Sequence, residues 1–119
     1  INAQANEIAY TKNVSEGLNA IVAAYDWAPG DRIVYCAALE HPNNIYPWRH
    51  LAARRGVELI EVEAVDGMIA PDRIIDAIDE RTRMVSLSSV TFAPGLVTDV
   101  APIGAACRDQ DILLLVDAV

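Results

Sequence analysis

Three short polar segments carry the side chains that could do chemistry in this chain. They are the turn Thr11–Gly17, which contains Ser15, the segment Glu40–Asn44, and Asp117 at the end of an apolar run. Backbone N–H groups and a hydroxyl at the start of a helix can bind a phosphate. An imidazole can stack on an aromatic ligand or transfer protons near neutral pH, and a carboxylate at the tip of a buried strand is costly unless a cation or a ligand meets it. Each segment is therefore a candidate for ligand binding.

Each segment also has a purely structural interpretation. Ser15 can cap the first turn of a helix, with Glu16 in the favoured acidic position. Asn44 can cap the next helix, and His41 can be an ordinary loop residue. Residues 86–95, in which small hydroxyl residues lead into a Pro-Gly turn, are expected to form a loop. The glycine-rich motifs of a P-loop or a dinucleotide fold are absent from the sequence, so a conventional nucleotide site is not expected.

The elements that must position these segments alternate along the chain. Apolar periodicity predicts helices at 15–27, 43–55, 71–78 and 99–108, and strands at 7–11, 32–36, 57–62, 83–88 and 112–116. Strands that alternate with helices form parallel βαβ units with right-handed crossovers. The expected fold class is α/β with a mainly parallel sheet. In such sheets ligands gather at the carboxyl ends of the strands.

Local signals refine this prediction. The aliphatic run that leads to Asp117 is typical of a strand buried on both faces of a sheet. The residues at 54–56, Arg-Arg-Gly, are a good helix stop, and Asp-Gly at 66–67 marks a turn. Within the helix that ends there, Trp48 is expected to face inward and His50 to lie on the surface.

Composition narrows the class of protein. The chain has 119 residues, of which 53% are hydrophobic, and a net charge of -8, which argues against binding to nucleic acid or to an anionic membrane. No apolar run is long enough to span a membrane, and no secretory signal is visible, so a cytoplasmic location is expected. Cys36 and Cys107 form no CxxC pair, so we expect two reduced, buried thiols and no metal site.

Taken in order, the polar motifs resemble a known family. The chain is similar to the first part of the large domain of class V aminotransferases, pyridoxal-phosphate enzymes that include cysteine desulfurases, selenocysteine lyases and isopenicillin-N-epimerase-like proteins. The resemblance covers essentially the whole chain. It rests on TKNVSEGLN at 11–19, GD at 30–31, EHPNNIYPW at 40–48, PG at 94–95 and VDAV at 116–119. The block at 40–48 is the most specific of these motifs.

The resemblance implies a cofactor site. Val14, through its backbone, and Ser15 would hold the phosphate of pyridoxal phosphate at a helix N-terminus. His41 would stack on the pyridine ring, and Asn44 would lie beside it. Asp117 would pair with the protonated ring nitrogen, which keeps the ring charged as an electron sink. That pairing would also offset the cost of a charge at the end of a buried strand.

Two departures from the family pattern affect this interpretation. Cysteine desulfurases usually have Asn, which contacts the ring hydroxyl of the cofactor, at the position of Phe92. Phe92 leans towards the epimerase-like or kynureninase-like branches, and plain packing is its alternative role. The family's Schiff-base lysine follows the Asp by a couple of dozen residues, whereas the only lysine here is Lys12. Lys12 is expected to be exposed or to help bind phosphate, so no catalytic residue is assigned, and neither Cys36 nor Cys107 inherits the desulfurase cysteine's role.

Two functional hypotheses follow. In the first, residues 1–119 are a single partial α/β cofactor-binding domain of an enzyme that acts on an amino acid, without the N-terminal segment, the rest of the large domain and the small domain. Such a chain would be inactive alone, and the family implies a homo-oligomer, usually a dimer. In the second, the chain is a stand-alone, non-catalytic α/β module for binding or interaction. A flavodoxin-like or Rossmann-like nucleotide binder fits the alternation but lacks the glycine signature.

Overall fold

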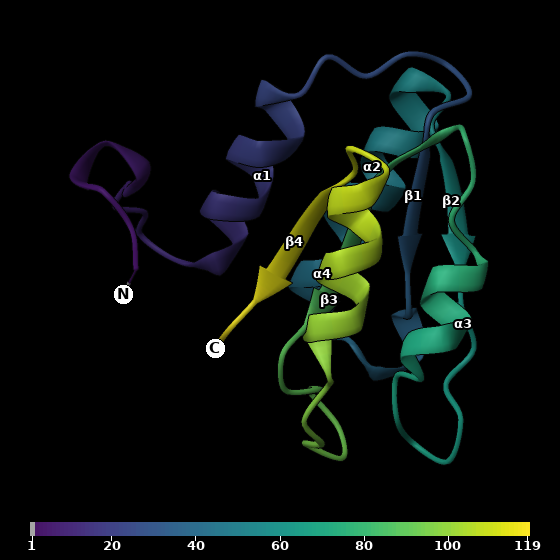
Figure 1. Ribbon diagram of the computed structural model, residues 1–119. Helices are drawn as coiled ribbons and strands as arrows, with labels where there is room; N and C mark the ends of the chain where they lie inside the picture. The colour runs from purple at the N-terminus through teal and green to yellow at the C-terminus, as the bar shows by residue number, and fades with distance from the viewer. Residues whose placement is uncertain (1) are drawn as a thin grey trace.

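The computed structural model describes residues 2–119, which form a sheet of four parallel strands covered by helices on both faces (Figure 1). The strands are β1 (Arg32–Tyr35), β2 (Glu58–Glu61), β3 (Thr82–Ser88) and β4 (Leu113–Asp117). The helices are α1 (Val14–Ala24), α2 (Tyr46–Arg55), α3 (Pro71–Asp76) and α4 (Val100–Asp109), with 3₁₀ turns at Ala5–Glu7, Ala37–Leu39 and Pro42–Asn44. The predicted α/β class with a parallel sheet is confirmed.

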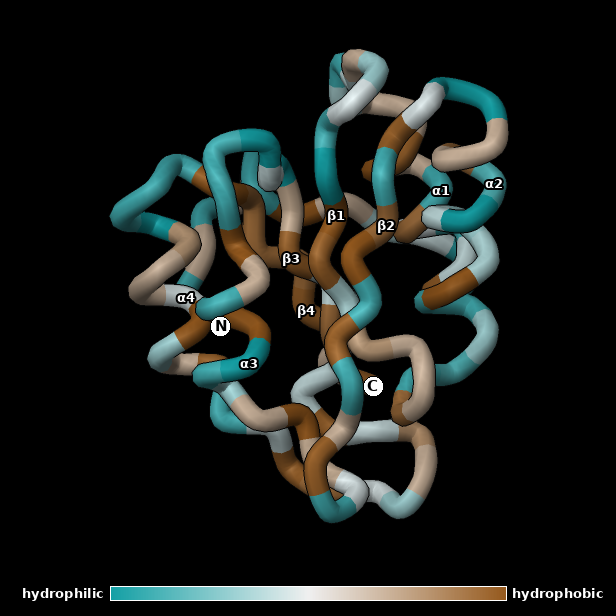
Figure 2. The backbone as a smooth tube through the Cα atoms, turned by 90° about the vertical axis from the view of Figure 1, so that its right-hand side faces the viewer, coloured by the Kyte–Doolittle hydropathy of each residue, from teal (hydrophilic) through white to brown (hydrophobic). Residues whose placement is uncertain are grey.

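The sheet lies between two pairs of helices, α1 with α2 on one face and α3 with α4 on the other, and Figure 2 shows the hydrophobic strands between these layers. Successive side chains along each strand point to opposite faces of the sheet, so each strand contributes to the core layers on both faces. Ile33 and Met84 pack with α1 and α2, whereas Val34 and Val85 pack with α3 and α4. Both faces of the two central strands are therefore buried, which is why their sequences are nearly continuous in apolar residues.

The strands lie in the order β2-β1-β3-β4. Successive strands are therefore added first on one side of β1 and then on its other side. The chain moves outward from β1 to β2, then returns across the sheet to β3 and continues to β4. In open α/β sheets, the crevice at the carboxyl ends of the strands where the order reverses is the usual ligand site. Here that crevice lies between β1 and β3, so the segments that follow these two strands form its walls.

Two sequence predictions about strands are wrong. Residues 7–11 do not form a strand, because no neighbouring segment pairs with them and their side chains are exposed. The run that ends at Asp117 does form β4, but it is not buried on both faces. Within residues 2–119, β4 is an edge strand that pairs only with β3, and Leu113 is 49% exposed. Burial of a strand depends on its neighbours, which the strand's own sequence does not report.

The local signals gave better predictions. Gly56 ends α2 in the left-handed conformation with φ of 70°, and Gly67 has φ of 75° in the turn that joins Val65 to Met68. Trp48 is fully buried and His50 is exposed, as expected. Glycine fits these turns because it lacks the Cβ that disfavours positive φ.

Cys36 and Cys107 are buried, free thiols, and both belong to the core between the sheet and helices α3 and α4. Burial raises the pKa of both Cys36 and Cys107 above the ordinary value for a thiol. The sequence prediction that both cysteines are buried is confirmed. In the part of the chain that the structure describes, every helix is too short or too polar to cross a bilayer.

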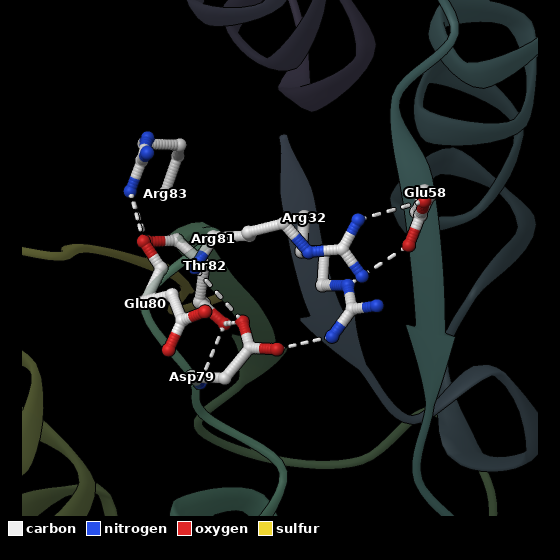
Figure 3. Close-up of polar contacts among 7 residues, drawn as sticks. All are labelled: Arg32, Glu58, Asp79, Glu80, Arg81, Thr82 and Arg83. Carbon is white, nitrogen blue, oxygen red and sulfur yellow. Dashed lines mark hydrogen bonds and ion pairs between the residues drawn. The ribbon is translucent and has the colours of Figure 1, made fainter. Parts of the chain in front are cut away.

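A network of ion pairs joins the amino ends of three strands, at the edge of the sheet away from the crevice (Figure 3). Arg32 at the start of β1 donates to Glu58 on β2 at 2.9 Å and also pairs with Asp79, which precedes β3. Arg81 donates to the second oxygen of Glu58 at 3.0 Å. The hydrogen bond to Glu58 raises the pKa of the Arg32 guanidinium, so this group stays charged throughout the useful pH range.

Replacing Arg32 by alanine should lower the melting temperature by a few degrees, because two carboxylates on neighbouring elements lose their shared cation. The loss should shrink at high salt, since these side chains are partly exposed and salt screens them. Thermal unfolding at low and high salt measures both effects. Arg49→Ala removes an exposed arginine of α2 that has no ion pair in residues 2–119, and it should change the melting temperature little.

Candidate functional site

A pocket of about 250 Å³ opens at the carboxyl ends of β3 and β4. Its wall combines residues from the start of α1, from the segment after β1, from the loop after β3 and from the end of β4. They are Val14, His41, Asn43, Ser88, Val90, Phe92, Asp117 and Val119. The volume is slightly below the usual range of small-ligand sites, which starts at about 300 Å³. Segments that are distant in sequence thus meet where the sheet topology predicts a ligand.

His41 forms part of one wall of the pocket. Its Nδ1 accepts a hydrogen bond from the backbone N–H of Asn43 at 3.3 Å, so the proton of the neutral ring is assigned to Nε2. The ring meets Phe92 edge-on, with 4.7 Å between ring centroids. The backbone N–H of Phe92 donates to the carbonyl of Leu39 at 2.9 Å, which ties the loop after β3 to the segment after β1. Two aromatic rings therefore stand beside the pocket.

Asp117 supplies the charge of the site. Its Oδ2 accepts a hydrogen bond from Asn44 Nδ2 at 2.9 Å, and its Oδ1 accepts one from the backbone N–H of Val119 at 3.1 Å. Within residues 2–119, no basic side chain lies within 4.0 Å of this carboxylate. A half-buried carboxylate without a cation favours a positively charged or N–H-bearing ligand.

Asn44 and a second acid, Glu40, lie beneath the pocket. Asn44 Nδ2 is 2.8 Å from Glu40 Oε2 and 3.0 Å from the hydroxyl of Ser88. Glu40 also accepts hydrogen bonds from the backbone N–H of Ser88 at 2.6 Å and from its hydroxyl at 2.5 Å. All three side chains are buried. One amide nitrogen thus links the two carboxylates, Glu40 and Asp117.

The start of α1 differs from the structural prediction for Ser15. Asn13, not Ser15, caps the helix, and its side chain accepts from the N–H of Glu16 at 2.9 Å. Asn13 is the cap because its backbone is still extended, as the N-cap position requires. The N–H groups of Val14 and Ser15 have no acceptor among residues 2–119. Both are therefore available to an anion.

The structure brings most of the predicted site residues together. Val14, His41 and Asp117 line one pocket, and Asn44 bonds to Asp117 from below. Ser15 instead lines a neighbouring hollow, which shares Asn43 with the pocket. The helix-capping interpretation of Asn44 is wrong, because Ile45 precedes α2 and its side chain makes no cap, while Asn44 reaches towards the sheet.

Sequence reasoning gave no role to Glu40 or Ser88. A signal was present in both cases, because Ser88 is a polar residue at the carboxyl end of β3 and Glu40 is a polar residue in the segment that follows β1. Lys12 is exposed and does not line the pocket, in agreement with its surface interpretation.

The donor and acceptor pattern of the pocket fits a flat aromatic cation. The rings of His41 and Phe92 offer surfaces for contact with a ring, and Asp117 offers an acceptor with an uncompensated charge. The free N–H groups at the start of α1 suit an anionic substituent. The residues present therefore fit a ligand with a cationic ring at one end and an anion at the other.

Known proteins are similar to this chain in both sequence and fold. A probable cysteine desulfurase from Methanothermobacter thermautotrophicus is 41% identical over 119 residues, which cover 99% of this chain and 29% of that protein. The apo structure of a cysteine desulfurase from Thermococcus onnurineus NA1 matches with a TM-score of 0.91 and 30% identity, over 100% of this chain and 30% of that one. The chain thus spans less than a third of the length of these relatives.

A third comparison concerns a structure with a bound cofactor. A mutant of C-DES with glycine covalently linked to its PLP cofactor matches with a TM-score of 0.78 and 28% identity, over 89% of this chain and 29% of that one. The family model for aminotransferase class-V matches residues 1–119, the whole sequence. Together with the parallel sheet and the pocket at its carboxyl edge, this match shows that the chain belongs to the aminotransferase class-V family.

Proposed function

We propose that residues 1–119 are a partial cofactor-binding domain of a pyridoxal-phosphate enzyme that acts on an amino acid, in the manner of a cysteine desulfurase. The single observation that carries the proposal is Asp117. This carboxylate faces a pocket with two aromatic rings and has no cation near it in residues 2–119. A pyridinium nitrogen supplies both the positive charge and the N–H that such a group requires.

The other residues then have defined tasks. His41 would lie against the face of the cofactor ring, with its Nδ1 accepting a hydrogen bond from the N–H of Asn43. Asn44 fixes Asp117 through its amide. Val14 and Ser15 would donate hydrogen bonds from their backbone N–H groups to the phosphate, which the positive end of the α1 dipole would also attract. When bound, pyridoxal phosphate acts as an electron sink for bonds at the amino acid's α-carbon.

The relatives favour the cysteine-desulfurase branch, since two of them carry that name. Phe92 is 64% exposed and contacts His41, so an aromatic contact here takes the place of an amide. The only lysine of these 119 residues is the exposed Lys12, outside the pocket. We therefore propose that the 119-residue chain by itself does not turn over an amino acid.

Assembly and location are part of the same proposal. A cytoplasmic protein is supported by two buried free thiols, which persist in a reducing compartment. A homo-oligomer is supported by exposed apolar side chains that line the pocket, including Val90 and Phe92. The same exposed surface would also favour the alternative, a non-catalytic interaction module, which differs in having no affinity for the cofactor.

Cofactor titration of the complete gene product tests the proposal. The protein should bind pyridoxal phosphate with a shifted absorbance and should release alanine and sulfur from cysteine. His41→Ala should weaken cofactor binding about 3–10-fold, the size of a lost ring contact. Tyr10→Ala removes a fully exposed ring that lines neither the pocket of Asp117 nor the hollow of Ser15, so the affinity of this variant should equal that of the wild type.

The 119-residue chain serves as a second arm of this experiment. Borohydride treatment should fix no cofactor on Lys12, and the chain should release no alanine. A complete protein without cofactor affinity would contradict the proposal and favour the interaction module. Turnover by the 119-residue chain would contradict only the statement that it is inactive alone.

A further inference from the structure

Glu40 is a buried acid without a counter-cation in residues 2–119. It is 6% exposed and accepts three hydrogen bonds, two from the N–H and hydroxyl of Ser88 and one from Asn44 Nδ2. Burial of a charge is tolerated only where donors surround it. The oxygens of Glu40 are the acceptors in all three contacts, so each of its neighbours turns a donor towards it.

This requirement fixes the orientation of the Asn44 amide. Asn44 is 2% exposed, and its Nδ2 lies 2.8 Å from Glu40 and 2.9 Å from Asp117. Its Oδ1 is buried and has no partner among the described residues. The reverse orientation would place Oδ1 between two carboxylates, where like charges repel. The amide therefore leaves one buried acceptor unpaired in order to offer hydrogens to both acids.

We propose that Glu40 is a positioning residue that acts through Asn44 on Asp117. Glu40 holds the NH₂ group of Asn44 towards Asp117, and Asn44 in turn holds the Asp117 carboxylate in the orientation that meets a ring nitrogen in the pocket. This inference rests on the proposed function, because the ring nitrogen is that of pyridoxal phosphate. Glu40 itself does not line the pocket, so its effect reaches the ligand only through the chain of hydrogen bonds.

Glu40→Gln tests the chain of hydrogen bonds in the complete protein. Glutamine has nearly the same size, but it keeps only one accepting oxygen, and its NH₂ group accepts a hydrogen bond from neither Ser88 nor Asn44. One amide must turn, and Asn44 then presents its oxygen to Asp117 or loses the contact. The dissociation constant for pyridoxal phosphate should rise about 10–100-fold, as expected for lost hydrogen bonds to charged groups. The visible circular dichroism of the bound cofactor should change as well.

A double-variant cycle separates positioning from simple support of the fold. Asn44→Ala should weaken binding as much as Glu40→Gln, and the double variant should be no weaker than Asn44→Ala alone, because both changes break one chain. Glu58→Gln is the matched control. It makes the same chemical change in the ion-pair network at the opposite edge of the sheet, and it should lower the melting temperature without changing cofactor affinity.

The outcomes distinguish this inference from the proposed function. A Glu40→Gln protein with wild-type affinity and circular dichroism overturns the inference alone, and so does a double variant whose two losses multiply. If Glu40→Gln does not fold, Asn44→Ala decides, and unchanged affinity in that variant also overturns it. A wild-type protein that binds no pyridoxal phosphate overturns the proposed function and this inference with it.

Discussion

Replacing Asp117 by asparagine in the complete protein is expected to lower turnover about 10²–10³-fold, the usual cost of losing one preorganised electrostatic contact. Both oxygens of Asp117 already accept hydrogen bonds from donors, Asn44 Nδ2 and the N–H of Val119. An asparagine must place its NH₂ group against one of these donors, and it brings no charge to the pocket. Steady-state kinetics with saturating cofactor, together with a cofactor titration, measure the loss.

Asp111→Asn is the matched control for this change. Asp111 precedes β4 and is exposed, and its φ of 56° lies in the left-handed region that asparagine tolerates. The same chemical change at this position should leave turnover unaltered. An Asp117→Asn protein within about threefold of wild-type turnover, when saturated with cofactor, would show that the carboxylate has no role in the reaction.

Trp48→Ala should be the most damaging single change to the fold. Trp48 is fully buried between α2 and the sheet, and its indole N–H donates to the hydroxyl of Ser86 at 3.1 Å. Its removal leaves a cavity and an unpaired hydroxyl, at a cost of about 3–5 kcal/mol. That is a large part of a typical net stability of about 5–15 kcal/mol. Denaturant unfolding of the apo protein should therefore show a much lower midpoint, or no folded baseline.

Two further variants define the cause of this loss. Trp48→Phe keeps an aromatic ring and loses the hydrogen bond, so it should fall between wild type and Trp48→Ala. Tyr46→Ala removes an aromatic ring on the same helix that is 65% exposed, and it should cost less than about 0.5 kcal/mol. Equal losses for Trp48→Ala and Tyr46→Ala would contradict the burial argument.

The features that were predicted correctly from the sequence are those that depend only on residues close together in the chain. Gly56 ends α2, and Gly67 lies in the turn between Val65 and Met68. Both positions have positive φ, which glycine adopts without help from distant residues. Trp48 and the strand cores follow from apolar periodicity over a few residues. By contrast, the exposed edge of β4 and the absence of a strand at 7–11 depend on whether another segment pairs there.

The site shows the same division. The resemblance directed attention to Val14, His41 and Asp117, and the sheet brings these residues to one pocket. The hydrogen bonds that join Glu40, Asn44 and Asp117 could not be predicted, because they depend on β4 lying next to β3 and on the side-chain orientations at the strand ends. The cap at Asn13 was missed for a local reason, since two good capping residues stand two positions apart.

The contact between Asn44 and Asp117 joins residues 73 positions apart in the chain. Such a contact forms only after the intervening segment has folded, because the entropy of closing so long a loop must first be offset by other interactions. A ligand that touches both sides of this contact therefore binds the assembled sheet and has no site on the unfolded chain. By mass action, at a concentration of about 100 times its dissociation constant, it would add about 2.7 kcal/mol to folding stability. A bound ligand in the pocket thus indicates that β4 has paired with β3 and that the sheet has folded.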